Sequence, residues 1–167
     1  MTIKNPKDVF LRLMSEARSN TERSANLYRE ISQAAEHPIV QEALEARAFI
    51  TDKNLEILDQ CFEIIGETPM KLIGRLHDVF FEDFGRDLAE IQSPAGRHLY
   101  MLAKATHLAY LRFAEYVMLI AASDACGHYG VGLLLESTLA DKLAFLERTQ
   151  RLVRVIIEDK VTERLAA

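Results

Sequence analysis

Residues 93–125, SPAGRHLYMLAKATHLAYLRFAEYVMLIAASDA, predict one long helix that organises the rest of the chain. Ser93 is a favourable N-cap, and Pro94 falls at the first helical position, where its missing N–H costs nothing. Gly127 ends the pattern. At about 1.5 Å per residue this helix is roughly 45–50 Å long, the length of one helix in a four-helix bundle. The spacing predicts a core face of Leu99, Leu102, Thr106, Ala109, Phe113, Tyr116 and Ile120.

The charge pattern and composition exclude several classes of protein. Arg112 and Glu115 interrupt the apolar run, so we expect a buried bundle helix and no membrane span. The chain is 49% hydrophobic and 27% charged with a net charge of −5, which is typical of a folded domain and argues against a nucleic-acid partner. The beginning MTIKNPKD lacks the apolar run of a signal peptide, which predicts a cytoplasmic protein. We expect Cys61 and Cys126 to be reduced and to fill apolar space.

Proline and glycine positions divide the remaining sequence into further helices. Each of the four prolines stands where a helix would begin, and no stretch alternates as a strand would. We predict long helices over residues 6–35, 38–65 and 131–161, and a short connecting helix over 69–84. The sequence therefore predicts an all-α, ferritin-like four-helix bundle, with residues 1–167 as a single domain. Helix stops are expected at Gly66, Gly85, Gly127 and Gly130.

Residues for catalysis or metal binding do not occur in the required patterns. A di-metal bundle uses Glu-x-x-His pairs, because residues three apart share a helix face. No acidic residue stands three positions from any of the five histidines, and the sequence has no Gly-x-Ser-x-Gly, phosphate loop or paired cysteines. We therefore predict no catalytic residue, no cofactor and no metal. The histidines tested are His37, His77, His98, His107 and His128.

Four segments resemble a known family in their order and spacing. They are Asp8-Val9-Phe10, residues 58–66 (LDQCFEIIG), residues 104–109 (KATHLA) and residues 136–141 (ESTLAD). Together they resemble the YciE/YciF-like ferritin-like proteins, a bacterial stress-associated family. The resemblance implies a ferritin-like shell with carboxylate and histidine metal ligands in its centre.

The chain departs from this family at the implied ligand positions. Of the acids that the resemblance implies in the last helix, one remains as Asp141. Losing the metal favours losing its acids, because an uncompensated buried carboxylate cluster is very costly. The substituted ligand positions are Thr21, Arg47, Ile50, Thr106, Ala109 and Lys142, and the candidates left for a metal are Glu22, His107 and Asp141.

Arg47 and Lys142 suggest two different arrangements. If either side chain reaches inward, its cation occupies the place of the metal and pairs with Asp141 or Glu45. In the alternative arrangement both side chains extend to solvent, with their stems on the core.

Three functions remain open from the sequence. The first is a metal-free module for association, with a second copy or a protein partner on the apolar tail 154–167, which implies a homodimer. The second is a small-ligand site in an apolar central pocket, and the third is a residual di-metal enzyme. The tail residues are Ile157, Val161 and Leu165, the ligand-site residues are Thr106, Tyr110, Tyr28 and His107, and the residual metal ligands are Asp141, His107 and Glu22.

Overall fold

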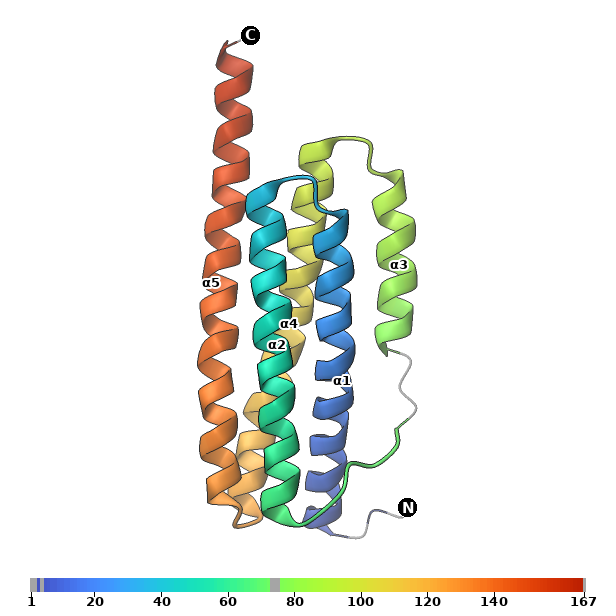
Figure 1. Ribbon diagram of the computed structural model, residues 1–167, viewed down its shortest axis with the longest axis vertical. Coiled ribbons are helices and arrows are strands. Elements are labelled where there is room, and N and C mark those ends of the chain that lie inside the picture. Colours follow the sequence, from blue (N-terminus) through green and yellow to red (C-terminus); the bar gives the residue numbers. More distant parts are fainter. Residues whose placement is uncertain (1–2, 4, 73–75, 167) are drawn as a thin grey trace.

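The computed structural model of the chain is an all-helical bundle (Figure 1). It describes residues 3, 5–72 and 76–166, and within the helices the side chains of residues 76, 77, 81 and 159–166 are not described. The elements are α1 (Pro6–Ala34), α2 (Pro38–Ile65), α3 (Leu76–Glu90), α4 (Pro94–Ala125) and α5 (Tyr129–Ala166).

Helices α1, α2, α4 and α5 form the bundle, and α3 lies outside it against α1 and α4. Each hairpin, α1–α2 and α4–α5, pairs two consecutive antiparallel helices, and a crossover that includes α3 joins the hairpins. One long crossover is the connectivity of ferritin-like bundles. The C-terminal end of α5 extends beyond the other helices (Figure 1). Within the described ranges, no helix combines the length and apolarity that crossing a membrane requires.

The predicted helix starts are confirmed for three of the four prolines. Pro6, Pro38 and Pro94 each occupy the first turn of a helix. The Asn5 side chain accepts a 2.9 Å hydrogen bond from the Asp8 N–H and so caps α1, as Ser93 caps α4. These caps satisfy N–H groups that have no partner within their helix.

Pro69 does not begin a helix. Residues 66–72 are not helical, 73–75 lie outside the described residues, and α3 starts at Leu76. The Met70 N–H donates a 3.0 Å hydrogen bond to the Ser15 hydroxyl, so this segment is held against α1. The predicted helix start at Pro69 is therefore wrong.

Two of the predicted glycine stops are also wrong, because Gly85 lies within α3 and Gly130 within the first turn of α5. Gly66 and Gly127 do end helices, with φ of +69° and +79°. Glycine reaches this left-handed region without a Cβ clash.

Gly66→Ala is expected to destabilise the fold by about 1 kcal/mol. Nothing lies within 4 Å of a Cβ built at Gly66, so the loss reflects backbone strain alone. Gly85→Ala is the matched control, because its Cβ site is equally open but its conformation is helical. Gly85→Ala should raise the free energy of unfolding by up to about 1 kcal/mol. Chemical denaturation of both variants measures the difference, and equal effects would contradict the strain argument.

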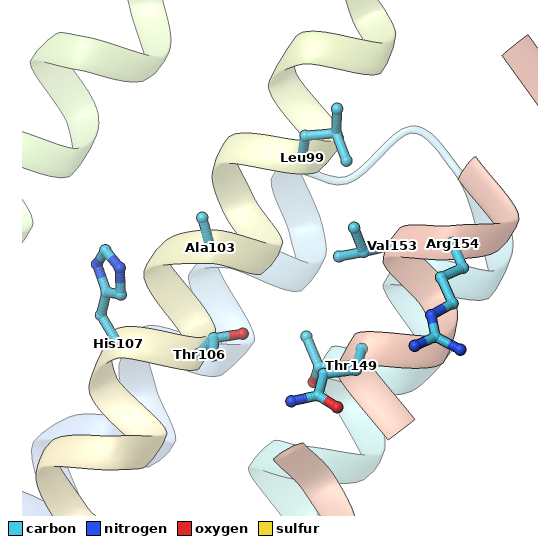
Figure 2. Close-up of a pocket in the computed structure, with 8 residues that line it drawn as sticks. Leu99, Ala103, Thr106, His107, Thr149, Val153 and Arg154 are labelled. Carbon is cyan, nitrogen blue, oxygen red and sulfur yellow. The ribbon is translucent and has the colours of Figure 1, made fainter. Parts of the chain in front are cut away.

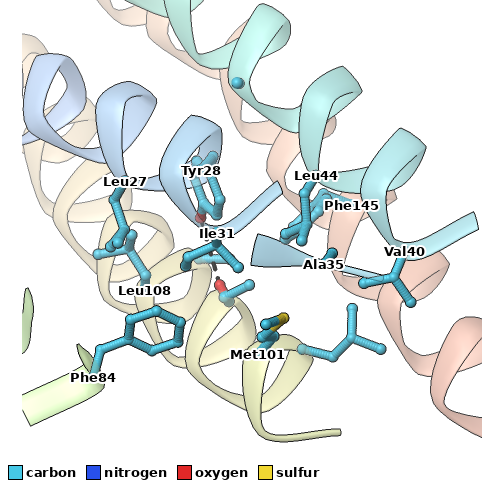
Figure 3. Close-up of a cluster of buried hydrophobic side chains, with 14 of the residues drawn as sticks. Leu27, Tyr28, Ile31, Ala35, Val40, Leu44, Phe84, Met101, Leu108 and Phe145 are labelled. Atoms are coloured by element: carbon cyan, nitrogen blue, oxygen red, sulfur yellow. Dashed lines mark hydrogen bonds between the residues drawn. The ribbon is translucent and has the colours of Figure 1, made fainter. Parts of the chain in front are cut away.

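Two apolar clusters fill the bundle. One contains Tyr28, Leu44, Met101 and Phe145, with Phe84 of α3 closing its side (Figure 3). The other is built on residues nearer the opposite ends of the helices, and includes Phe10, Leu58, Leu119 and Leu135.

The core face of α4 is rotated from the predicted one. Leu102, Ala109 and Tyr116 are buried as expected. The other four predicted residues are half-buried, and the described core face includes Ala105 and Arg112. The helix is apolar almost all round, so its spacing alone does not select one face. The half-buried residues are Leu99, Thr106, Phe113 and Ile120.

Candidate site: a buried cation cluster

A layer of polar side chains crosses the bundle between the two apolar clusters. Every bundle helix contributes to it, and all of its members are buried. The hydroxyls of Thr51 and Thr138 donate hydrogen bonds to backbone carbonyls of their own helices, so both hydroxyl donors are satisfied locally. The layer comprises Thr21, Ser24, Arg47, Thr51, Asn54, Arg112, Thr138 and Lys142.

Three of these side chains are basic, namely Arg47 of α2, Arg112 of α4 and Lys142 of α5. Each is 2% exposed. We define Arg47, Arg112 and Lys142 as the cation cluster. Like charges brought together in a medium of low polarity repel strongly, so this arrangement is costly unless other groups compensate it.

Aromatic rings give two of the cations part of that compensation. The Arg47 guanidinium carbon lies 4.7 Å from the centre of the Phe145 ring and 5.5 Å from that of Tyr28. The Lys142 ammonium lies 3.6 Å from the centre of the Tyr116 ring. The negative face of an aromatic ring attracts a cation, by about 2 kcal/mol or more when water is excluded.

Glu115 brings a negative charge to the edge of the cluster. One of its oxygens lies 2.7 Å from Arg112 Nη1, and its side chain is 27% exposed. The Asn20 amide donates a 3.1 Å hydrogen bond to the other oxygen. This single carboxylate leaves a formal excess of two positive charges when the three cations are protonated.

Burial controls protonation within the cluster. Desolvation, followed by the charge of Arg47, lowers the pKa of Lys142 to about 7. Desolvation also lowers the pKa of Arg112 and raises the pKa values of Tyr28 and Glu115. Lys142 is therefore the cluster member that exchanges its proton near neutral pH.

The structure confirms the inward arrangement of Arg47 and Lys142, because both are buried. Their predicted partners, Asp141 and Glu45, lie on the exposed surface, and Glu45 accepts a hydrogen bond from Gln41. The pairing expected from the sequence is therefore wrong. A charged carboxylate is cheaper to keep in water than in the core.

The six substituted ligand positions separate into two groups. Thr21, Arg47, Ala109 and Lys142 are buried in the bundle. Ile50 and Thr106 are half-buried. The Thr106 hydroxyl donates to the Leu102 carbonyl one turn earlier.

The three remaining metal candidates do not converge. Glu22, His107 and Asp141 are all exposed, on α1, α4 and α5. Glu22 pairs with Arg18, 3.5 Å away on its own helix. Across the described residues, no group of three or more His, Cys, Asp or Glu side chains could hold a metal ion.

Sequence reasoning missed Arg112, Glu115 and Asn54 as members of the centre. A signal was present, because Arg112 stands three residues after Ala109 and four before Tyr116. Both neighbours were assigned to the core, and such spacing puts Arg112 on the same face. Charged side chains are usually exposed to solvent, however, and this preference argued against a place for Arg112 in the core.

The ligand site predicted in the centre is not formed. Tyr28 is buried and donates to the Ala105 carbonyl at 3.4 Å, whereas Tyr110 is exposed. A separate groove of about 470 Å³ lies between α4 and α5 (Figure 2). Thr106 and His107 are two of its lining residues, so the predicted residues are divided between the core and the surface. The groove is lined by Leu99, Ala103, Thr106, His107, Thr149, Gln150, Val153 and Arg154.

The four long helices and their single crossover define a ferritin-like bundle, as predicted. The chain belongs to the family described as domain of unknown function DUF892, whose model matches residues 5–163. The expected resemblance to YciF-like proteins is confirmed by this family match and by solved structures.

The structural matches extend over nearly the whole chain. The Escherichia coli stress protein YciF aligns with a TM-score of 0.87 at 19% identity, over 93% of this chain and 99% of that chain. YcfI from Rhodopseudomonas palustris aligns with a TM-score of 0.84 at 20% identity, over 89% of this chain and 94% of that chain. A structure described as ferritin-like diiron-carboxylate proteins from Bacillus anthracis aligns with a TM-score of 0.69 at 13% identity, over 90% of this chain and 99% of that chain. No curated protein matches the chain in sequence. These likenesses show the fold.

The residues in the centre do not fit the di-metal group that the fold implies. A divalent cation requires acidic or neutral lone-pair donors, whereas Arg47 and Arg112 present N–H donors and no acceptor. Several of those donors are buried without a hydrogen-bond acceptor. A metal ion placed here would add positive charge to the cation cluster.

Proposed function

We propose that this chain is a metal-free ferritin-like module that associates with a second copy of itself through the outer face of α4. The supporting observation is that this face is exposed but contains no Asp, Glu, Lys or Arg side chain. We call it the α4 outer face and define it by Ala103, His107, Tyr110, Leu111, Ala114, Val117, Met118 and Ala121.

Between residues 103 and 121, the charged residues of α4 lie away from this face. Arg112 is inside the bundle, and Glu115 is half-buried beside it. Lys104 lies over the Phe80 and Tyr100 rings, towards α3. An exposed helix face is normally polar, so an apolar stripe at helical spacing marks a surface that another element covers.

A second copy suits this stripe better than a partner of opposite charge. Copies with a net charge of −5 repel each other, and a face without charge keeps that repulsion smallest. The face is also self-complementary. When two α4 helices cross antiparallel about Ala114, Tyr110 of one copy meets Met118 of the other, because each lies four residues from the centre. The small Ala114 side chain permits close approach of the helices.

The C-terminal end of α5 supports association at a second place. This helix extends beyond the bundle (Figure 1), and both Val155 and Ile157 are exposed on it. The predicted tail contacts Val161 and Leu165 lie outside the described side chains. A standard interface covers about 800 Å² per partner, more than one helix face provides, so residues flanking α4 must contribute.

Met118→Glu is expected to convert the dimer to a monomer. Each protomer would then bury a carboxylate in an apolar contact, which is costly because no cation of the face compensates it. Sedimentation equilibrium of the wild type and the variant measures the change. We expect the dissociation constant of the dimer to rise at least about tenfold in the variant.

Phe49→Glu is the matched control, because Phe49 on α2 is 63% exposed and Met118 is 62% exposed. It should leave the dimer intact. A monomeric wild type would contradict the proposal. Dissociation caused by Phe49→Glu but not by Met118→Glu would place the contact on α2.

A further inference from the structure

The cation cluster contains more donors than the protein satisfies. Nε and Nη1 of Arg47 are buried without an acceptor, and the same is true of Nε and Nη2 of Arg112. The 2.7 Å approach of Arg112 Nη1 to Glu115 lacks hydrogen-bond geometry. Buried donors left unmatched are rare in folded proteins, and a bound water or ion is a common explanation.

The charge balance distinguishes between these two occupants. A water molecule accepts hydrogen bonds but leaves the positive charge uncompensated. The groups that face Lys142 are Arg47 of α2, Arg112, Glu115 and Tyr116 of α4, and Asp141 on its own helix. Of these, the buried groups are mainly positive or neutral, because Tyr116 stays protonated and Asp141 is at the surface.

We propose that Arg47, Arg112 and Lys142 bind one small inorganic anion of the halide class inside the bundle. Such an anion accepts hydrogen bonds from several directions and brings the negative charge that the cluster lacks. The buried surroundings, which include the rings of Tyr28, Phe145 and Tyr116, favour a monovalent, weakly hydrated ion over a multivalent, strongly hydrated one. The centre of the fold thus holds an anion, where a ferritin-like enzyme holds cations.

Thermal unfolding of the full-length protein at pH 6 tests this site. Sodium chloride and sodium bromide are compared with sodium gluconate at equal ionic strength, so that general screening cancels. Chloride and bromide should raise Tm in a saturable way, by roughly 5–10 °C when the free anion is about 100 times its Kd.

Lys142→Met removes one ligand while keeping an apolar stem of similar length. Its half-saturating chloride concentration should be at least about tenfold higher than that of the wild type. Lys104→Met is the matched control, because Lys104 also lies over a tyrosine ring, 5.1 Å from the centre of Tyr100, but is only half-buried. This control should respond to chloride as the wild type does.

Crystals grown with bromide give an independent measurement that does not depend on any variant. An anomalous peak within hydrogen-bond reach of Arg47 and Arg112 supports the site. Equal Tm values in chloride and gluconate would overturn the proposal. Equal chloride responses of Lys142→Met and the wild type, or a bromide peak confined to the surface, would do the same.

Discussion

Lys142→Met is expected to stabilise the folded protein by about 2–4 kcal/mol at pH 6 in a gluconate buffer. Methionine keeps the buried stem and removes a charge that Arg47 and Arg112 repel. Replacing buried ionic groups by apolar ones of similar volume is often stabilising. Urea denaturation measures the free energy of unfolding of both proteins.

The stabilisation should depend on pH in a defined window. The pKa of Lys142 is about 7 in the folded protein, against an ordinary value of 10.5. Between these values the unfolded chain binds a proton that the folded chain does not, so wild-type stability rises with pH. In this window, the deprotonation of Lys142 raises the free energy of unfolding by up to about 1.4 kcal/mol per pH unit. The advantage of Lys142→Met is therefore full below pH 7 and shrinks towards pH 10.5.

Lys104→Met is again the control, because its half-buried ammonium is not part of the cluster. It should change stability by less than about 1 kcal/mol, with no change of slope in this window. A destabilised Lys142→Met in gluconate, with the wild-type pH slope, would contradict the view that the charge is buried at a cost.

Phe145→Ala should destabilise the protein by about 3–5 kcal/mol. The ring is buried, stands edge-on to Tyr28 at 5.8 Å between centroids, and lies 4.7 Å from the Arg47 guanidinium carbon. Truncation leaves a cavity and removes the ring that attracts the buried cation. Thermal or urea unfolding measures the loss.

A double-mutant cycle with Arg47→Met separates these two effects. Phe84→Ala is the matched control, because Phe84 and Phe145 are both 7% exposed in the same apolar cluster. Phe84 stacks on Tyr100 instead of on Arg47. We expect a coupling of about 0.5–2 kcal/mol between positions 145 and 47, and additivity between 84 and 47. Equal couplings would show that Phe145 acts only by filling space.

Local chemistry made the helices of this protein predictable. The effects of the Ser93 cap, of Pro94 and of Gly66 extend over one turn of backbone. The bounds of α2, which Gly66 ends, agree with the prediction. Residues 69–72 were wrongly assigned to a helix, and the hydrogen bond from the Met70 N–H to Ser15 holds them against α1 instead. The absence of Glu-x-x-His pairs was likewise readable from spacing alone.

The composition of the centre was only partly predictable. Arg47 and Lys142 were identified because they stand at positions where the resemblance implies ligands. Arg112 follows no such pattern. Its burial depends on the rotation of α4, which places Tyr116 near Lys142 and the apolar Met118 outside. A face chosen by hydrophobicity alone keeps Ala109 and Tyr116 in the core but turns Arg112 towards solvent.

The sequence by itself determined four long helices, the proline and glycine positions that bound them and the absence of Glu-x-x-His pairs, because each follows from residues within a few positions of one another. Tertiary structure decided that three cations share the core and that an uncharged face of α4 meets solvent. The physical reason is that α4 is nearly apolar on every side. Its orientation is therefore set by packing against α1 and α5, and by rings that stabilise buried cations, rather than by its own pattern.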